Sequence, residues 1–150
     1  MAQRESGYAR QALDAYWTPA WVFSAIKAVE VFHHPVDIAP RDNDGYDFLA
    51  DTTKINEILT NPPFSLAEQF IRHGLTICCK KMAFLLPVTF DAAHTRRDLF
   101  ENRPFKAKYT LTKRIRWDNL EQKKNGPSTN HAWFVWDFDY AGRSFMGWLP

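Results

Sequence analysis

The stretch at residues 55–65 reads INEILTNPPFS and decides the fold prediction. Its apolar first half predicts a buried strand that ends at Asn61. Pro62 and Pro63 have no backbone N–H, so neither can continue the hydrogen bonds of a strand. Directly afterwards, the S-x-x-E pattern at residues 65–68 predicts a capping box that opens a helix. A strand, a tight turn and a helix in succession are typical of an α/β fold.

Similar patterns extend on both sides of this stretch. Thr18 and Pro19 are typical of a helix start, with Thr at the N-cap and Pro at the first helical position. Val22, Ile26 and Val29 would then share one face of that helix. The remaining pattern predicts strands at residues 36–38, 55–60, 82–86, 109–117 and 132–138, and helices at residues 65–77 and 92–101. This order predicts an α/β fold with a mixed sheet and an antiparallel end.

The length and composition predict one domain, in which the charged residues are unevenly distributed. The 150 residues, 45% of them hydrophobic, suffice for a single domain over residues 1–150, with residues 1–15 as a polar arm. Net charge is only +2, yet residues 80–124 hold twelve of the 19 Lys and Arg against five acidic residues. This segment fits either a polyanionic partner or a solvated basic face.

Other features restrict the compartment and the chemistry. The neighbouring Cys78 and Cys79 cannot link distant segments, which fits a reducing, cytoplasmic compartment. The polar N-terminus lacks the apolar core of a signal peptide, and no apolar run approaches the roughly 20 residues of a membrane helix. The five histidines show no H-x₃-H spacing, so no metal site is expected.

The tetrapeptide NPPF at residues 61–64 suits chemistry on an aromatic amine. The Asn61 side-chain oxygen and a backbone carbonyl can each accept one N–H of the amine, which favours a tetrahedral nitrogen with a usable lone pair. Pro62 and Pro63 would hold the carbonyls rigidly, and Phe64 offers a ring on which a flat base can stack. The alternative is a plain proline turn, but ligands of open α/β sheets do bind at the carboxyl ends of strands.

The chain resembles the S-adenosylmethionine-dependent amino-methyltransferases, chiefly the DNA adenine-N6 enzymes of phages and prophages. NPPF matches their motif [D/N]-P-P-[Y/F/W], and Tyr16-Trp17-Thr18-Pro19 matches their Y-x-T-P start. Residues 131–136, HAWFVW, are similar to their closing strand. Matching segments run from about residue 16 to residue 137, and the resemblance implies a Rossmann-like methyltransferase fold.

The resemblance also implies roles for individual residues. Asn61, Pro62, Pro63 and Phe64 would form the catalytic motif, with the carbonyl of Pro62 as the second acceptor for the amine. Residues near the cofactor S-adenosylmethionine would be Tyr16, Thr18, Pro19, Asp37, Asp47 and Phe48. Within this set, Asp37 would hold the ribose, whereas Asp47 and Phe48 would border the adenine. DNA would be the partner, with phosphate contacts from Arg96, Arg97, Lys123 and Lys124.

One part of the family pattern is missing. The family carries a glycine-rich cofactor loop of the type D/E-P-x-x-G-x-G after its first strand, but residues 20–36, AWVFSAIKAVEVFHHPV, contain no glycine. A strand-helix-strand unit needs roughly 30 residues, more than this interval provides. The first strand and helix of the cofactor half are therefore expected to be absent. Three alternatives follow: another segment, for example residues 28–32, takes the strand's place beside residues 55–60; a homodimer forms through the exposed sheet edge; or the domain is only marginally stable.

Three function classes remain open at this point. The first is a DNA adenine-N6 methyltransferase, either active or degenerate. The second is a methyltransferase for an RNA base or a protein amide, since such enzymes share the N-P-P-[F/Y] motif. The third is an inactive remnant that binds nucleic acid, which the missing glycine loop favours.

Overall fold

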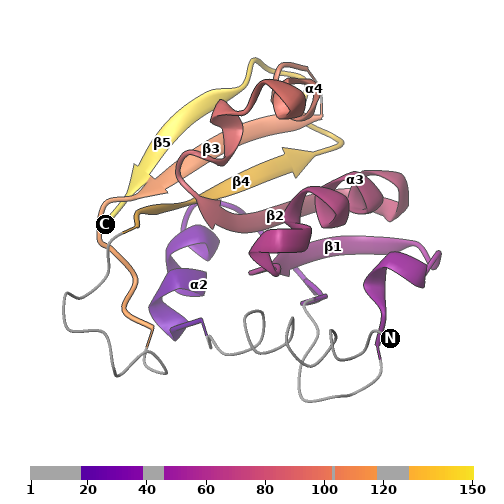
Figure 1. Cartoon of the computed structure of the whole chain (residues 1–150), viewed down its shortest axis with the longest axis horizontal. Helices are drawn as coiled ribbons and strands as arrows, with labels where there is room; N and C mark the ends of the chain where they lie inside the picture. Colours follow the sequence, from indigo (N-terminus) through magenta and orange to yellow (C-terminus); the bar gives the residue numbers. More distant parts are fainter. Residues whose placement is uncertain (1–17, 39–45, 103, 118–128) are drawn as a thin grey trace.

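The computed structural model describes residues 18–38, 46–102, 104–117 and 129–150. These residues form an α/β fold around a five-stranded mixed sheet with the strand order β1-β2-β4-β3-β5 (Figure 1). β1 pairs with β2 in parallel, β3 pairs with β5 in parallel, and β4 runs antiparallel to both β2 and β3. The strands are β1 (Ile55–Thr60), β2 (Cys78–Pro87), β3 (Phe105–Leu111), β4 (His131–Asp137) and β5 (Phe145–Leu149).

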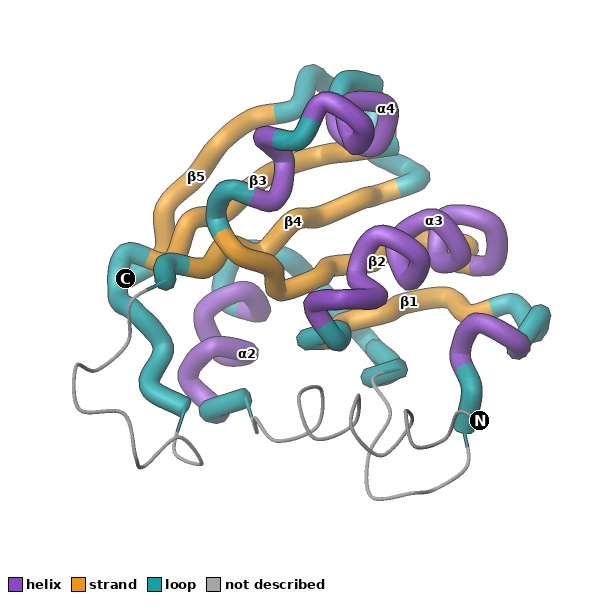
Figure 2. The backbone as a smooth tube through the Cα atoms, viewed as in Figure 1, coloured by secondary structure: helices purple, strands orange, loops and turns teal. Residues whose placement is uncertain are grey.

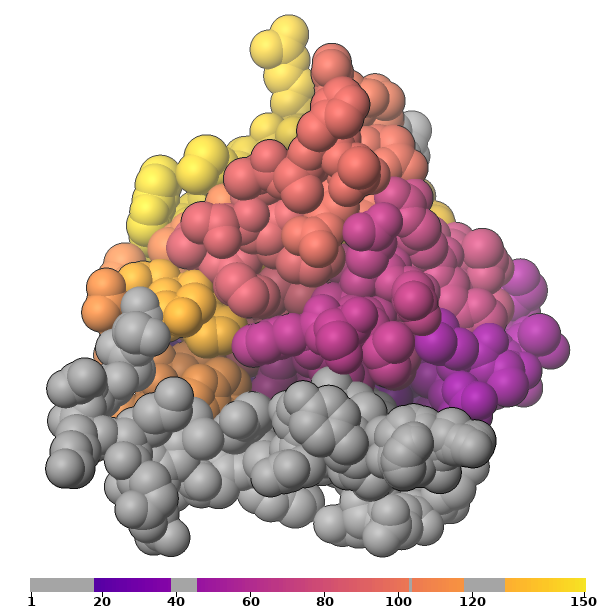
Figure 3. All heavy atoms as spheres, in the orientation of Figure 1, coloured from indigo at the N-terminus to yellow at the C-terminus, as the bar shows by residue number. Residues whose placement is uncertain are grey.

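Helices cover both faces of this sheet. Val22 and Ile26 of α2 (Ala20–Lys27) pack in one apolar cluster with Leu59, Leu85 and Trp133. The other face carries α3 (Ala67–Ile77) and α4 (Arg97–Phe100) (Figure 2). In the space-filling view, atoms of α3 and of the segment from β2 to α4 cover much of this second face (Figure 3). The described residues also form four short 3₁₀ helices: Phe48–Ala50, Phe64–Leu66, Phe90–Ala92 and His94–Arg96.

The antiparallel strand β4 connects the two layers of helices. Its residues 131–136 are all buried. The indole N–H of Trp133 donates to the carbonyl of Val22 in α2 at 3.0 Å, and that of Trp136 donates to the carbonyl of Leu99 in α4 at 2.9 Å. A buried indole needs such a partner for its N–H. Trp133 and Trp136 are therefore core residues, and neither is placed to stack on a base.

Both predicted helix starts differ in the structure. Pro19, not Thr18, is the N-cap of α2, and the hydroxyl of Thr18 makes no capping bond. Val29 lies beyond the end of the helix and is 49% exposed. The predicted capping box at residues 65–68 is also wrong, because a 3₁₀ turn precedes α3 and the helix begins at Ala67 without a side-chain cap. The prolines impose that tight turn before the helix.

Several predicted boundaries are wrong as well. The strand predicted at residues 109–117 is β3, which begins at Phe105 and ends at Leu111. The helix predicted at residues 92–101 is a 3₁₀ turn followed by the short α4. β5 was not predicted, because its alternating pattern is weak: Phe145, Met146 and Trp148 are exposed on an edge strand. The strand predicted at residues 55–60 is confirmed.

The position beside β1 belongs to Val36. The N–H of Val36 donates to the carbonyl of Glu57 at 2.9 Å, and the N–H of Leu59 donates to the carbonyl of Val36 at 3.0 Å. These bonds form a parallel bridge between Val36 and Ile58. The alternative that residues 28–32 form a strand there is wrong, since these residues turn directly after α2. The bridge satisfies the backbone of the otherwise open edge of β1.

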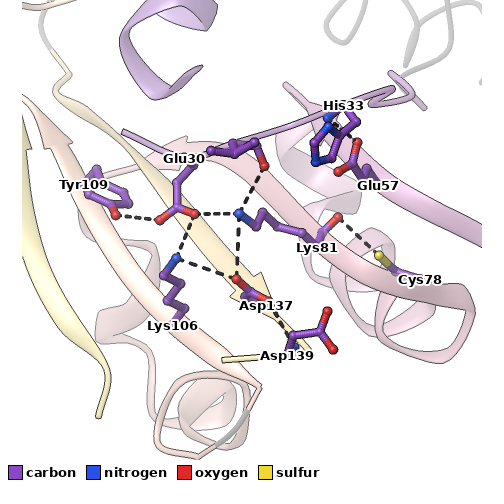
Figure 4. A network of polar contacts seen from close by, with 10 residues as sticks. Glu30, His33, Glu57, Cys78, Lys81, Lys106, Tyr109, Asp137 and Asp139 are labelled. Carbon is purple, nitrogen blue, oxygen red and sulfur yellow. Dashed lines mark hydrogen bonds and ion pairs between the residues drawn. The ribbon is translucent and has the colours of Figure 1, made fainter. Parts of the chain in front are cut away.

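A buried charge network lies where α2 ends (Figure 4). The carboxylate of Glu30 accepts hydrogen bonds from the ammonium groups of Lys81 and Lys106, each at 2.9 Å, and from the hydroxyl of Tyr109 at 2.6 Å. Asp137 lies 3.7 Å from Lys81 and 3.6 Å from Lys106. Two carboxylates thus face two ammonium groups.

Among the described residues, no helix is long and apolar enough to cross a membrane.

Candidate active site at the carboxyl end of β1

Asn61 is held by a residue from a distant part of the chain. Its side-chain N–H donates to the hydroxyl oxygen of Thr18 at 2.9 Å, which joins the residue after β1 to a residue two positions before α2. This bond fixes the plane of the Asn61 amide. The structure therefore brings together two of the predicted site residues, and the hydroxyl of Thr18 serves Asn61 in place of the helix cap predicted for it.

Asp37 lies at the same edge of the sheet. Thr60, the last residue of β1, donates its hydroxyl to Oδ1 of Asp37 at 2.6 Å. Asp37 is exposed and directly follows Val36, which bridges to β1. The backbone bridge and the Thr60 bond together fix the carboxylate next to the start of the NPPF motif.

Pro62 and Pro63 form the turn between β1 and α3. Pro62 and Pro63 are both buried, and the N–H of Leu66 donates to the carbonyl of Pro63 at 3.0 Å. The carbonyl of Pro63 is therefore used within the turn, and Pro62 is the residue whose carbonyl matches the predicted second acceptor. Phe64 follows with 48% of its surface exposed. The structure thus places an exposed aromatic ring three residues after Asn61, and the predicted stacking of a base on Phe64 stays a prediction.

A row of rings extends from Phe64 across the sheet edge. The ring of His131 lies 5.7 Å from that of Phe64, at an interplanar angle of 30°, and 5.6 Å from that of Trp117, edge to face. His131 begins β4, and its partner Pro87 ends β2. Leu59 and Trp133 face α2. Asn61 lies two residues after Leu59, and His131 lies two residues before Trp133. Because side chains alternate along a strand, Asn61 and His131 point to that same face.

Two polar side chains in this group have buried atoms without partners. Within the described part of the chain, Oδ1 of Asn61 and both ring nitrogens of His131 are buried and make no hydrogen bond. Burial lowers the pKa of His131 to about 4, and the backbone of Thr129 opposes this shift without forming a geometrically good hydrogen bond. The imidazole is therefore neutral at physiological pH. Buried polar atoms without partners are rare and call for an explanation.

Sequence reasoning placed His131 in the closing strand but gave it no role. Trp117 was not among the predicted site residues. Neither residue is near Asn61 in the sequence, so their contacts with the NPPF motif depend on strand order alone. The signal that could have found His131 is its position at the start of a strand, directly before five apolar residues.

The predicted cofactor residues are only partly brought together. Asp47 caps the 3₁₀ helix Phe48–Ala50, with its Oδ1 accepting from the N–H of Leu49 at 3.1 Å. Phe48 is buried and packs against Phe70 and His73, with ring centroids 5.1 and 4.9 Å away. Their predicted contact with an adenine stays a prediction. Tyr16 lies outside the described residues.

The predicted phosphate contacts have other partners. Arg96 donates to Glu68 at 3.1 Å and its guanidinium stacks on Phe90 at 3.9 Å, whereas Arg97 donates to Glu101 at 2.7 Å. Lys123 and Lys124 lie outside the described residues. Three further cations follow β3 at the site edge and are exposed, namely Lys113, Arg114 and Arg116. They lead directly to Trp117, which contacts His131.

Comparison with known proteins adds no relative. No family model matches the chain, and no curated protein matches its sequence. Among the described residues, no group of three or more His, Cys, Asp or Glu side chains is placed to hold a metal ion. The site must therefore be interpreted from its own geometry: one fixed amide, one exposed ring, one neutral imidazole and nearby cations.

Proposed function

We propose that this chain is a DNA adenine-N6 methyltransferase that uses S-adenosylmethionine and has a shortened cofactor-binding half. The observation that carries the proposal is the state of the Asn61 amide. Its N–H is occupied by Thr18, whereas its oxygen is buried without a partner in the described part of the structure. A fixed acceptor without a donor is what an amine-binding site requires before its substrate arrives.

The chemistry follows from two acceptors and one ring. Oδ1 of Asn61 would accept one N–H of the target amine, and the carbonyl of Pro62 would accept the other. Both bonds favour a tetrahedral nitrogen, whose lone pair then points away from the ring plane of the base. The nitrogen would become cationic as its bond to the methyl group forms and the S–C bond of the sulfonium breaks, leaving a neutral thioether, and it would afterwards release one proton to solvent. Catalysis here consists of positioning and electrostatic stabilisation.

Phe64 would bind the base itself. Its ring is half exposed and follows the two buried prolines, so one face can stack on a flat base. Base stacking on an aromatic side chain contributes about 1–3 kcal/mol. A base in duplex DNA must first leave the helix to reach such a site. The cations Lys113, Arg114 and Arg116 would meet the phosphates beside it.

The residues present fit the cofactor in part. The exposed carboxylate of Asp37, oriented by Thr60, suits the two hydroxyls of a ribose. Thr18 lies beside the catalytic amide, where the methionine end of the cofactor would lie by the resemblance. When bound, the cofactor supplies the methyl group from its sulfonium. The absence of glycine from residues 20–36 predicts weaker binding than in a site with a glycine loop.

The fold supports the same proposal. The mixed sheet with an antiparallel strand agrees with the Rossmann-like methyltransferase fold implied by the resemblance. In that family the missing strand would lie beside the strand that ends at Asn61. Val36 bridges to Ile58 in this position, so the segment that leads into Asp37 would replace the missing strand. This replacement brings Asp37 next to Thr60.

The first experiment is isothermal titration with S-adenosylmethionine, with S-adenosylhomocysteine as the check. Binding in the micromolar range followed by methylation of adenine in DNA would support the proposal, and Asn61→Ala should lower methylation by about 10²–10³-fold while binding is retained. No heat at millimolar ligand would contradict the enzymatic proposal for this chain.

A second candidate is an inactive protein that binds nucleic acid. Two observations favour it: residues 20–36 have no glycine, and Phe48 is buried in the core rather than open to a cofactor adenine. Salt-dependent DNA binding without any binding of S-adenosylmethionine would identify this case.

A further inference from the structure

His131 is an unexplained polar residue beside the NPPF motif. His131 is buried, with 2% of its surface exposed, and neither ring nitrogen has a hydrogen-bond partner in the residues that the structure describes. A buried polar group without a partner costs roughly 1–3 kcal/mol. Trp117 and Phe64 contact the ring through their π-systems, which does not satisfy its N–H group. An apolar residue would fill this position at lower cost.

The second unpartnered group lies on the same face of the same edge. Oδ1 of Asn61 is an acceptor, whereas a neutral imidazole offers one N–H donor and one acceptor. The two residues are separated by the single strand β2, because the strand order is β1-β2-β4. Neighbouring strands lie about 4.8 Å apart, so the two backbones are roughly 10 Å apart across the sheet, and the register sets His131 about two residues further along the strand direction. The two side chains would have to reach toward each other over the end of β2 to contact neighbouring atoms of one flat heterocycle.

We propose that His131 reads the target base by donating its ring N–H to the ring nitrogen next to the amine held by Asn61. This inference rests on the proposed function. For adenine the pair of contacts would be the N6 amine to Asn61 and the ring nitrogen N1 to His131. The substrate class is therefore a heterocycle with an acceptor adjacent to its exocyclic amine. His131 is a specificity residue here, because the reacting nitrogen is held by Asn61.

Phe64 controls access to His131 in this arrangement. Its ring lies 5.7 Å from the imidazole, yet it is itself half exposed, because Phe64 is the first residue of a surface 3₁₀ helix. Rotation of the Phe64 side chain would uncover the imidazole and place the phenyl ring against the incoming base. The low pKa of His131 keeps the ring neutral, so that it can offer one donor without adding a buried charge.

The test uses a short thymidine single strand with one central adenine, or with 1-deazaadenine, which keeps the amine and lacks only the ring nitrogen. The protein carries ¹⁵N-labelled histidine, and the ring signals of His131 are followed by NMR, assigned with His131→Phe. We expect the adenine strand to shift these signals and to bind about tenfold more tightly than the 1-deazaadenine strand. His131→Phe should bind both strands equally, and His131→Gln, which keeps an N–H donor, should recover part of the difference.

Equal binding of the two strands by the wild-type protein, or unchanged His131 signals on binding, would overturn the inference. The proposed function fails separately: no methyl transfer from S-adenosylmethionine, with the difference between the two strands retained, would contradict the enzyme but not the recognition of the base. His131→Phe is compared only after its cooperative unfolding has been confirmed, and the wild-type comparison is decisive without it.

Discussion

Thr18 accepts a hydrogen bond from the Asn61 side chain at 2.9 Å, across 43 positions of the sequence. This bond connects the two motifs, Y-x-T-P and NPPF, that carry the resemblance to amino-methyltransferases. Because the side-chain N–H of Asn61 is bonded to Thr18, Oδ1 is the amide atom that remains for a substrate. The orientation of this single amide is the basis of the proposed chemistry.

The first prediction concerns this pair. Asn61→Ala should lower kcat for adenine methylation by about 10²–10³-fold, because one acceptor for the amine is lost. Thr18→Val should lower kcat by about tenfold through misorientation of the amide, and Thr18→Ser should restore it. Methyl transfer under saturating cofactor is the measurement. Unchanged kcat in Thr18→Val would show that the bond does not position Asn61.

The second prediction concerns the buried charge network. Burial alone would raise the pKa of Glu30, but hydrogen bonds from Tyr109, Lys106 and Lys81 outweigh it and hold the pKa below its usual value. Glu30→Gln removes one of the two carboxylates that face the ammonium groups of Lys81 and Lys106. It should therefore lower the free energy of unfolding by about 3–5 kcal/mol in urea denaturation.

Glu101→Gln is the matched control for this substitution. It removes the exposed ion pair with Arg97, and the free energy of unfolding should change by less than about 0.5 kcal/mol. Equal effects of Glu30→Gln and Glu101→Gln would mean that the network contributes no more than a surface pair.

The third prediction concerns pH. The pKa of His131 is about 4 in the folded chain, below its usual value of 6.5, so the unfolded chain binds the proton first as pH falls. Stability should therefore decrease from about pH 6.5 down to about pH 4, by roughly 3 kcal/mol in total, and this contribution is constant below that range. His131→Phe should flatten this part of the curve, measured by urea denaturation at a series of pH values. If the free energy of unfolding depended on pH equally in both proteins, the effect could not be assigned to His131.

The fourth prediction concerns the edge strand β5. A Cβ at Gly147 would lie 2.9 Å from Cδ1 and 3.1 Å from Cε1 of Tyr109. Tyr109 cannot easily move, because its hydroxyl is bonded to Glu30. Gly147→Ala should therefore destabilise the protein by about 1–3 kcal/mol, whereas Met146→Ala, at an exposed position of the same strand, should have little effect. Thermal unfolding of both variants tests this difference.

The fifth prediction concerns DNA binding. Arg116 is exposed next to Trp117 at the site edge, whereas Arg97 is paired with Glu101 beyond the opposite face of the sheet. Arg116→Ala should weaken DNA binding and reduce the slope of log K against log salt concentration by about 1. Arg97→Ala should leave the slope unchanged. The reverse result would favour the phosphate contacts predicted from the sequence.

Local pattern was sufficient for the two parallel strands β1 and β2. The apolar runs at residues 55–60 and 82–86 predicted β1 and the buried part of β2, and the prolines after Asn61 predicted where β1 ends. These features depend on neighbouring residues, since apolar periodicity and the missing N–H of proline act over a few positions. The same local reasoning placed NPPF at a carboxyl strand end and ahead of a helix.

Local pattern failed where a distant partner decided the outcome. Thr18 was predicted to cap a helix, but its hydroxyl accepts from Asn61. Arg96 pairs with Glu68 and stacks on Phe90, contacts that its sequence neighbours did not indicate, and its predicted phosphate contact stays a prediction. In each case a polar side chain satisfies its hydrogen bonds with a group that only the folded chain brings near.

The sequence by itself determined the α/β class, the strand that leads to Asn61 and the residue types of the candidate site. The tertiary structure alone decided that Val36 lies beside β1, that His131 lies between Phe64 and Trp117, and which Asn61 atom has no partner. The reason is physical: strand order and side-chain contacts across a sheet depend on packing between segments far apart in the chain, which residue spacing does not encode.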